Sequence, residues 1–258
     1  QNQSDTRGVD IQKVGIKGIE LPLVIQRKDK EDIVIYSNAT AGVSLPAHYK
    51  GTHMSRFVEV LNEWRSKHTL GVDIKGCVEA IVKRLEAKSG YLKFDFKYFI
   101  EKKAPVSGRK SVLDLDCSFK GIKRQGQPML FELGVNVPFT SLCPCSKEIS
   151  AYGAHNQRSV ARVALRFKAG FDCIYIEDLA ALIEKQGSAP IYPLLKREDE
   201  KFVTEEAYEN PKFVEDILRD TVISLRELKG LAWFAVECEN YESIHNHSAY
   251  ASHEETLD

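Results

Sequence analysis

Four stretches in the first half of the chain predict β-strands, and over the last two of them apolar residues alternate cleanly with polar residues. The predicted strands cover residues 19–25, 33–44, 92–100 and 113–119. Between the second and third strands, apolar residues recur at helical spacing over 54–64 and over 74–85. Asp73 is expected to cap the second of these two helices. The first half therefore predicts two strands, two helices and two strands.

The second half of the chain shows a similar order. Alternating residues predict strands over 131–137, 161–167 and 232–238. One helix is predicted over 176–185. A longer helix is predicted to open at Asn210-Pro211, as a cap followed by a proline in the first turn, and to close at Gly230.

Strands that are adjacent in sequence favour antiparallel hairpins over parallel β-α-β units. The predicted fold class is therefore α+β, with two tandem modules, each an antiparallel four-stranded sheet with two helices on one face. The polar, glycine-containing stretch 120–127 is the predicted boundary, which gives modules of 1–124 and 125–258. One sheet face per module is left uncovered, so we expect an oligomer.

Composition narrows the class of protein. The 258 residues carry a formal net charge of −1, which disfavours a nucleic-acid partner. No apolar run reaches membrane-spanning length, and the polar first ten residues lack the apolar core of a signal peptide. Six cysteines in a chain of this length are too few for a disulfide scaffold. The prediction is a soluble, cytoplasmic protein with neither a membrane nor a nucleic-acid partner.

Metal-ligating residue types gather in the second half of the chain. The segment Cys143-Pro144-Cys145 is followed by His155 and then by the acidic run 196–200. Proline removes a hydrogen-bond donor, so Cys-Pro-Cys is a poor core strand. A cysteine, a histidine and a carboxylate spread over some sixty residues predict a three-ligand site with one position open to water, as in a metal hydrolase. Spacing alone does not choose among Glu198, Asp199 and Glu200.

Six segments, in order, resemble one known family. They are the segments 50–57 (KGTHMSRF), 141–147 (SLCPCSK), 153–158 (GAHNQR), 192–197 (YPLLKR), 213–216 (FVED) and 242–247 (ESIHNH). Together they resemble the type IB GTP cyclohydrolases, which are members of the tunnelling-fold superfamily, and the resemblance runs from about Gly8 to His253.

The resemblance implies two tandem tunnelling-fold modules and a homotetramer with active sites at subunit interfaces. It also implies conversion of GTP and water to 7,8-dihydroneopterin triphosphate and formate, the first step of folate and pterin synthesis, with one divalent metal per active site.

By the same resemblance, Cys143, His155 and Glu200 are the expected metal ligands. This mixed set of sulfur, nitrogen and oxygen donors would accept zinc, manganese or iron. Proton transfers to the opening ring require general acids and bases. The catalytic candidates are Glu215, His245, His247 and Cys145. His245 and His247 alternate and are expected on one face of a terminal strand or extended segment.

Recognition of guanine requires an acceptor for two adjacent donors, N1–H and the 2-amino group, and a carboxylate accepts both. Glu242 occupies this place by resemblance, and Glu239 is its nearest rival. The chain has no phosphate-binding glycine loop, so cationic side chains must hold the triphosphate. The first candidates are Lys50, His53 and Arg56, at a helix entrance; the second choices are Lys147, Arg158, Lys196 and Arg197.

Two alternatives from other classes remain. One is another tunnelling-fold enzyme, such as the nitrile reductase of queuosine synthesis, which would use a cysteine nucleophile and a nicotinamide. The other is a non-catalytic purine-binding or metal-storage protein. The expected partnership of Cys143 with His155 and Glu200 argues against the first, and Glu215 together with the two histidines argues against the second.

Overall fold

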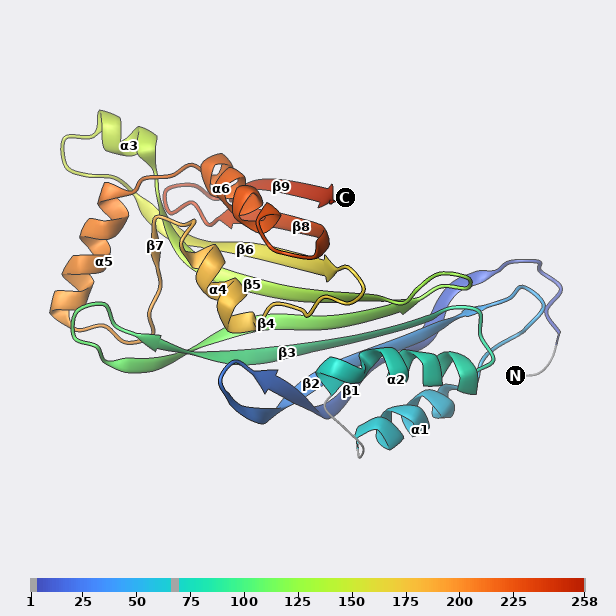
Figure 1. Cartoon of the computed structure of the whole chain (residues 1–258). Coiled ribbons are helices and arrows are strands. Elements are labelled where there is room, and N and C mark those ends of the chain that lie inside the picture. The colour runs from blue at the N-terminus through green and yellow to red at the C-terminus, as the bar shows by residue number, and fades with distance from the viewer. Residues whose placement is uncertain (1–3, 66–69, 258) are drawn as a thin grey trace. The chain divides into compact units, whose positions relative to one another are not determined.

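The structure, a computed structural model, describes residues 4–65 and 70–257 (Figure 1). These residues form six helices and a nine-stranded, mostly antiparallel sheet. The strand order is β1-β2-β3-β4-β5-β6-β8-β9, and β7 pairs with β5. The chain clusters into two compact units. The first comprises Gln1–Lys97 with Cys117–Leu133, and the second comprises Tyr98–Asp116 with Gly134–Asp258.

The elements of the first 123 residues follow the order predicted from the sequence. They are β1 (Ile11–Arg27), β2 (Lys30–Leu45), α1 (Met54–Arg65), α2 (Leu70–Arg84), β3 (Gly90–Lys103) and β4 (Lys110–Lys123). The strands extend beyond their alternating cores because antiparallel pairing continues into polar residues, for example from Ile25↔Ile33 to Arg27↔Lys30. Asp73 lies at a break in α2, where its φ of −118° leaves the helical range. The predicted start of the second helix therefore coincides with a kink.

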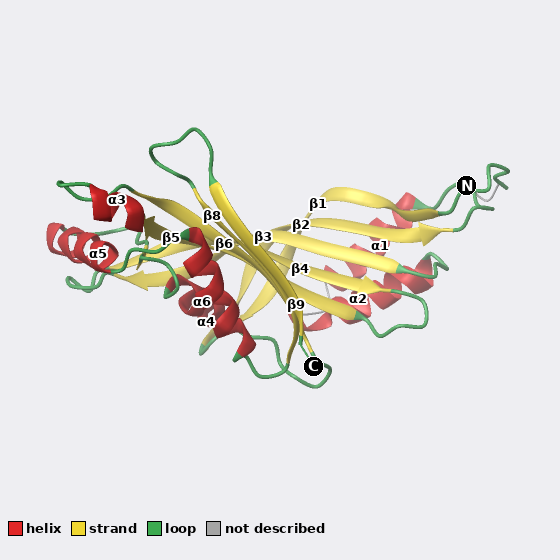
Figure 2. Cartoon of the chain, turned by 90° about the horizontal axis from the view of Figure 1, so that it is seen from above, coloured by secondary structure: helices red, strands yellow, loops and turns green. Residues whose placement is uncertain are grey.

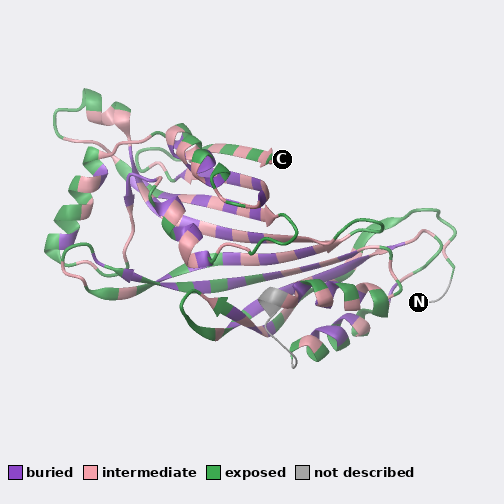
Figure 3. Cartoon of the chain, viewed as in Figure 1, coloured by how far each residue is buried: buried purple, intermediate pink, exposed green. Residues whose placement is uncertain are grey.

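The core of the first unit lies between its strands and its two helices, which cover one face of the sheet (Figure 2). Phe57 and Val60 of α1 are fully buried, as are Leu92 and Phe94 of β3. Burial alternates along the strands, as Figure 3 shows. Residues that alternate between apolar and polar in the sequence therefore alternate between the core and the solvent in the strand.

The remaining elements are β5 (Leu130–Leu142), α3 (Pro144–Ile149), β6 (Asn156–Phe167), α4 (Ile176–Glu184), β7 (Ala189–Pro190), α5 (Arg197–Glu209), α6 (Val214–Arg226), β8 (Leu231–Asn240) and β9 (Ala249–Thr256). The three predicted strands and both predicted helices are present, although the longer helix has other bounds. The helices α3 and α5 and the strands β7 and β9 were not predicted from the apolar pattern. Among the described residues, no helix has the length and apolar character needed to cross a bilayer.

The predicted start of the longer helix was wrong. α6 begins at Val214, with Phe213 as its N-cap, and the Phe213 N–H donates to Asp216 Oδ2 at 3.1 Å. Asn210 is used in a tertiary contact instead, because its side-chain amide donates to the carbonyls of Gly187 at 3.0 Å and Ser188 at 3.2 Å. The helix also ends at Arg226, before the predicted Gly230.

A buried carboxylate explains why the charged run after Lys196 is helical. Asp199 is fully buried at the start of α5 and accepts hydrogen bonds from the backbone N–H groups of Val106, Ser107 and Lys196 at 2.8–2.9 Å. It also accepts a 2.6 Å bond from the Ser107 hydroxyl. Desolvation opposes ionisation, but these hydrogen bonds outweigh it and hold the pKa of Asp199 well below its usual range. Asp199 thus fastens α5 to the turn between β3 and β4.

A buried ion pair joins β3 to α4 in the second unit. Lys102 Nζ lies 2.7 Å from both carboxylate oxygens of Glu184, and the two side chains are only 10% and 9% exposed. The Tyr192 ring lies beneath the ammonium, 4.8 Å from ring centroid to Nζ. Burial raises the pKa of Glu184, and the Lys102 charge opposes that rise.

We expect Glu184→Leu alone to lower the free energy of unfolding by about 3–5 kcal/mol, because it leaves the Lys102 ammonium buried without a partner. The double variant Lys102→Met/Glu184→Leu should regain most of that loss. Urea denaturation of both single variants and the double variant measures the coupling. If the double variant loses as much free energy of unfolding as the two single variants do together, the two residues are not coupled.

Candidate functional site

The predicted ligands Cys143 and His155 lie side by side in the second unit. Cys143 directly follows β5, and His155 directly precedes β6. The Cys143 N–H donates to the His155 carbonyl at 3.1 Å. Ser146 bridges the same two residues, because its hydroxyl accepts from the His155 N–H at 3.2 Å and donates to the Cys143 carbonyl at 3.1 Å. The loop between the two strands is therefore closed at its base.

The Cys-Pro-Cys segment forms the start of α3. Cys143 is the N-cap, and its sulfur accepts from the Ser146 N–H at 3.5 Å. Pro144 is the first helical residue, where its fixed φ and missing N–H are tolerated. Cys143 is half-buried, whereas Cys145 is exposed. The two sulfurs thus have different surroundings, although only one residue separates them.

Strand pairing brings Glu242 to His155. Ser159 of β6 faces Asn240 of β8, and the Tyr241 N–H donates to the Arg158 carbonyl at 3.0 Å. As a result, Glu242 Oε2 lies 3.7 Å from His155 Nδ1, with both side chains largely buried. The imidazole of His155 and the carboxylate of Glu242 therefore lie together, next to the backbone of Cys143.

Glu239, the rival of Glu242, has a different partner. Its carboxylate lies 2.7 Å from Arg162 Nη2. The hydrogen bond from Arg162 and a second from Ser248 lower the pKa of Glu239. Glu239 is thus held in an ion pair, and Glu242 is the carboxylate that faces the histidine.

The two terminal histidines are not on a strand, which corrects the sequence prediction. His245 and His247 lie in the turn between β8 and β9, and both are exposed. Their rings are stacked, with centroids 5.0 Å apart. The His245 N–H donates to the Glu242 carbonyl at 3.3 Å. The pair therefore follows Glu242 directly and adjoins the candidate site through this turn.

Glu215 is exposed in the first turn of α6. The Lys212 N–H, just before this helix, donates to the Leu142 carbonyl at 3.1 Å. Leu142 precedes Cys143, so the start of α6 lies against the end of β5.

Among the three carboxylates of the acidic run, only Asp199 is engaged in the interior. Glu198 and Glu200 are exposed in the first turn of α5. Within the described parts of the chain, no three or more cysteine, histidine, aspartate or glutamate side chains are grouped to hold a metal ion. Cys143 and His155 are joined by a backbone hydrogen bond.

The cationic candidates lie in separate places. Lys50, His53 and Arg56 belong to the first unit, at and before the start of α1, and Arg56 donates to the Arg84 carbonyl at 3.3 Å. Lys196 caps α5, and Arg197 begins it. Lys147 is engaged with the Tyr208 carbonyl and ring, while Arg158 is exposed.

Gln157, which was not among the residues predicted from the sequence, contacts His155. It is buried, and its side-chain oxygen lies 2.9 Å from His155 Nδ1. A signal was present in the sequence, because Gln157 and Ser159 continue the inward-facing positions of Ala161 and Val163. Two polar residues on the core face of a strand require partners.

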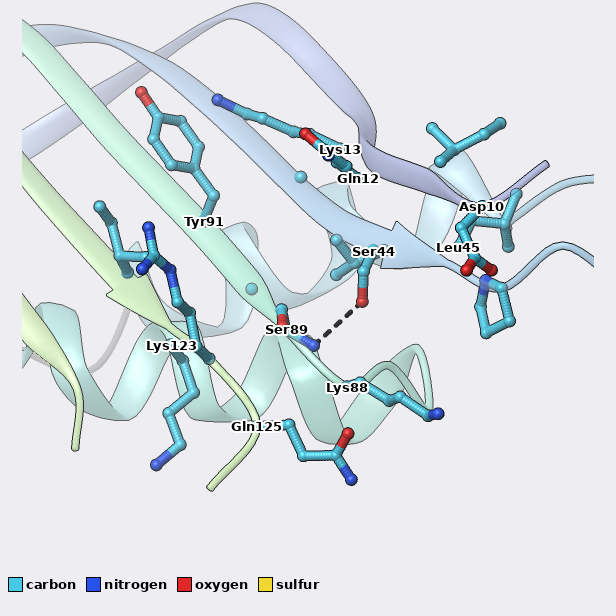
Figure 4. Close-up of a pocket in the computed structure, with 17 residues that line it drawn as sticks. Asp10, Gln12, Lys13, Ser44, Leu45, Lys88, Ser89, Tyr91, Lys123 and Gln125 are labelled. Atoms are coloured by element: carbon cyan, nitrogen blue, oxygen red, sulfur yellow. Dashed lines mark hydrogen bonds between the residues drawn. The ribbon is translucent and has the colours of Figure 1, made fainter. Parts of the chain in front are cut away.

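A pocket of about 780 Å³ in the first unit contains none of the candidate site residues (Figure 4). It lies at the ends of β1 to β4, and Lys13, Lys88, Lys123 and Arg124 line it. Lys13 Nζ lies over the Tyr91 ring, 2.9 Å from its centroid. Burial, together with the charges of nearby lysines, lowers the pKa of Lys13.

The fold is similar to that of uricases. Uricase from Arthrobacter globiformis matches 96% of this chain and 94% of its own, with a TM-score of 0.58 at 10% identity. A uricase from Bacillus fastidious matches 95% and 93%, with a TM-score of 0.58 at 8% identity. At such identities the likeness shows the fold alone.

The sequence comparison identifies the family. Residues 1–251 match the family described as type I GTP cyclohydrolase FolE2. The GTP cyclohydrolase FolE2 of Geotalea uraniireducens is 50% identical over 252 residues, which is 98% of this chain and 91% of that protein. The protein of the same name from Geobacter metallireducens is 51% identical over 252 residues, 98% and 94% of the two chains. The chain belongs to the type I GTP cyclohydrolase FolE2 family.

We expect alkylation of the native protein at pH 8 to modify Cys145 first, because its side chain is exposed. Burial raises the pKa of Cys77, Cys173 and Cys238 to about 12, so few of these thiols are ionised. Mass spectrometry of digested samples gives the order of labelling, and Cys145→Ser should remove the fast phase. Equal rates at Cys238 and Cys145 would contradict the packing described for β8.

Proposed function

We propose that the protein is a GTP cyclohydrolase that converts GTP and water to 7,8-dihydroneopterin triphosphate and formate. The observation that carries the proposal is the approach of Glu242 to His155, whose carbonyl accepts the backbone N–H of Cys143. The names of relatives at about 50% identity over nearly the whole chain support the same activity. Family membership favours this reaction over a nitrile reductase or a non-catalytic binding protein.

We infer that Cys143 and His155 hold a divalent metal. Thiolate sulfur and imidazole nitrogen are donors that fit zinc, and a carboxylate would add a donor suited to manganese or iron. Glu200 remains our candidate for the third ligand. When bound, such an ion lowers the pKa of water and supplies a nucleophile at neutral pH.

Glu242 is the residue that we propose binds the guanine ring of the substrate. Its carboxylate can accept both the N1–H and the 2-amino group of guanine. Its position beside His155 would place the purine next to the metal ligands. For the triphosphate we retain Lys50, His53 and Arg56, with Lys196 and Arg197 as the second choice.

Other residues are proposed to transfer protons during the reaction. Glu215, at the start of α6, and the stacked pair His245 and His247 are the proposed general acids and bases. Cys145 remains a catalytic candidate, because it is exposed and only one residue separates it from Cys143.

We also propose that the chain consists of two tandem tunnelling-fold modules, 1–124 and 125–258, and assembles as a homotetramer. The likeness to uricases supports the fold. Apolar side chains on exposed strand positions support assembly: Val34 is 69% exposed, and Tyr36 is 86% exposed. A cytoplasmic location accords with this function.

We expect Cys143→Ala and His155→Ala each to lose metal and activity together, because each removes one donor from a site that a folded scaffold holds. Elemental analysis and formate release measure the two losses. The sedimentation coefficient should stay that of the wild-type protein, since the apolar core is untouched. A variant that keeps stoichiometric metal would remove that residue from the ligand set.

Two further variants separate substrate recognition from chemistry. Glu242→Ala should weaken GTP binding by about 10- to 100-fold or more, because two guanine donors lose their acceptor, while the metal stays bound. Glu215→Gln should bind GTP normally and lose turnover, because the amide cannot relay a proton. Calorimetry with GTP and pterin fluorescence measure the two effects. Wild-type binding by Glu242→Ala, or full turnover by Glu215→Gln, would overturn this division of roles.

A further inference from the structure

We propose that Gln157 is a positioning residue that holds His155 in the tautomer protonated at Nδ1, which leaves Nε2 as the free lone pair of the site. His155 directly precedes β6, and Gln157 is the second residue of that strand. Gln157 Oε1 lies 2.9 Å from His155 Nδ1. A neutral imidazole carries one proton, so the group that faces one nitrogen decides the state of the other.

A buried chain of polar side chains fixes the glutamine. Its amide nitrogen donates to the Ser141 hydroxyl at 2.8 Å, and the hydroxyls of Ser141 and Ser159 lie 2.8 Å apart. Gln157 is 7% exposed, and both serines are fully buried. With its NH₂ group turned towards Ser141, the amide presents its oxygen to the imidazole, and this oxygen can only accept a hydrogen bond.

Glu242 favours the same tautomer of His155. Its Oε2 lies 3.7 Å from His155 Nδ1, the nitrogen that faces Gln157. An ionised carboxylate has no proton to donate, so it favours N–H over a lone pair at that nitrogen. Two acceptors from different segments, Gln157 on β6 and Glu242 after β8, thus face Nδ1. Both favour a proton on Nδ1 and a lone pair on Nε2.

The consequence for the site rests on the proposed function. A histidine ligand must present a bare nitrogen, and a hydrogen bond to its other nitrogen orients the ring and raises its basicity. Gln157 would supply that bond to His155, and the serine pair would keep Gln157 in place. Residues that touch neither metal nor substrate would therefore determine which ring nitrogen of His155 is available to the metal.

The tautomer can be read directly from metal-free protein. A long-range ¹H–¹⁵N correlation spectrum, recorded where His155 is neutral, distinguishes Nδ1–H from Nε2–H by its coupling pattern. We expect Nδ1–H in the wild-type protein. We expect Nε2–H to gain population in Gln157→Met, which has similar length and no acceptor. Gln157→Glu, which keeps an acceptor, should retain Nδ1–H, as should the control Asn156→Ala, whose exposed side chain faces away from the core.

A wild-type spectrum that shows Nε2–H would overturn the proposal, and this result needs no variant to fold. An unchanged tautomer in folded Gln157→Met would also overturn it. Zn²⁺ titration gives a second readout. We expect about 10- to 100-fold weaker binding by Gln157→Met and near wild-type binding by Gln157→Glu. If wild-type protein shows Nδ1–H but binds no Zn²⁺, the tautomer assignment stands and the metal proposal fails.

Discussion

The antiparallel register between β6 and β8 is the constraint on which the candidate site depends. Ser159 faces Asn240, and the ladder continues to Phe167 and Leu231. Buried Ala161 and Val163 on one strand face Cys238 and Val236 on the other, so a slip by one residue would turn a row of apolar side chains to solvent. The hydrophobic register therefore also fixes where Glu242 emerges beside His155.

Buried polar groups orient helices and side chains that apolar packing alone would not hold in one position. Asp199 ties the start of α5 to the turn at Val106 and Ser107, and Lys102 ties β3 to Glu184 of α4. Gln157 does the same for the ring of His155. Each of these contacts satisfies a polar group that would be costly to bury alone, so each specifies one arrangement of its neighbours. Pieces of the site are thus oriented by groups that do no chemistry themselves.

The fold and the function of this protein are inferred from different observations. The uricases match nearly the whole chain at 10% identity or less, which shows that this architecture accommodates very different sequences. The FolE2 relatives match at about 50% identity over nearly the whole chain, which shows the family. A reaction is therefore argued from the side chains at the strand ends and from the family, and not from the sheet.

The sequence by itself determined the elements whose burial is periodic. The alternation over 92–100 and the helical spacing over 54–64 correspond to β3 and α1, because a repeating core contact leaves a repeating apolar residue. The role of Cys143 and His155 as metal ligands stays a prediction from the sequence, and the structure adds the backbone hydrogen bond that joins them. Only the tertiary structure decided that Asp199 is an anchor, that α5 is helical, and that His245 and His247 lie in a turn. These outcomes depend on partners distant in sequence, such as Ser107 for Asp199, and no local pattern encodes a hydrogen bond across ninety residues.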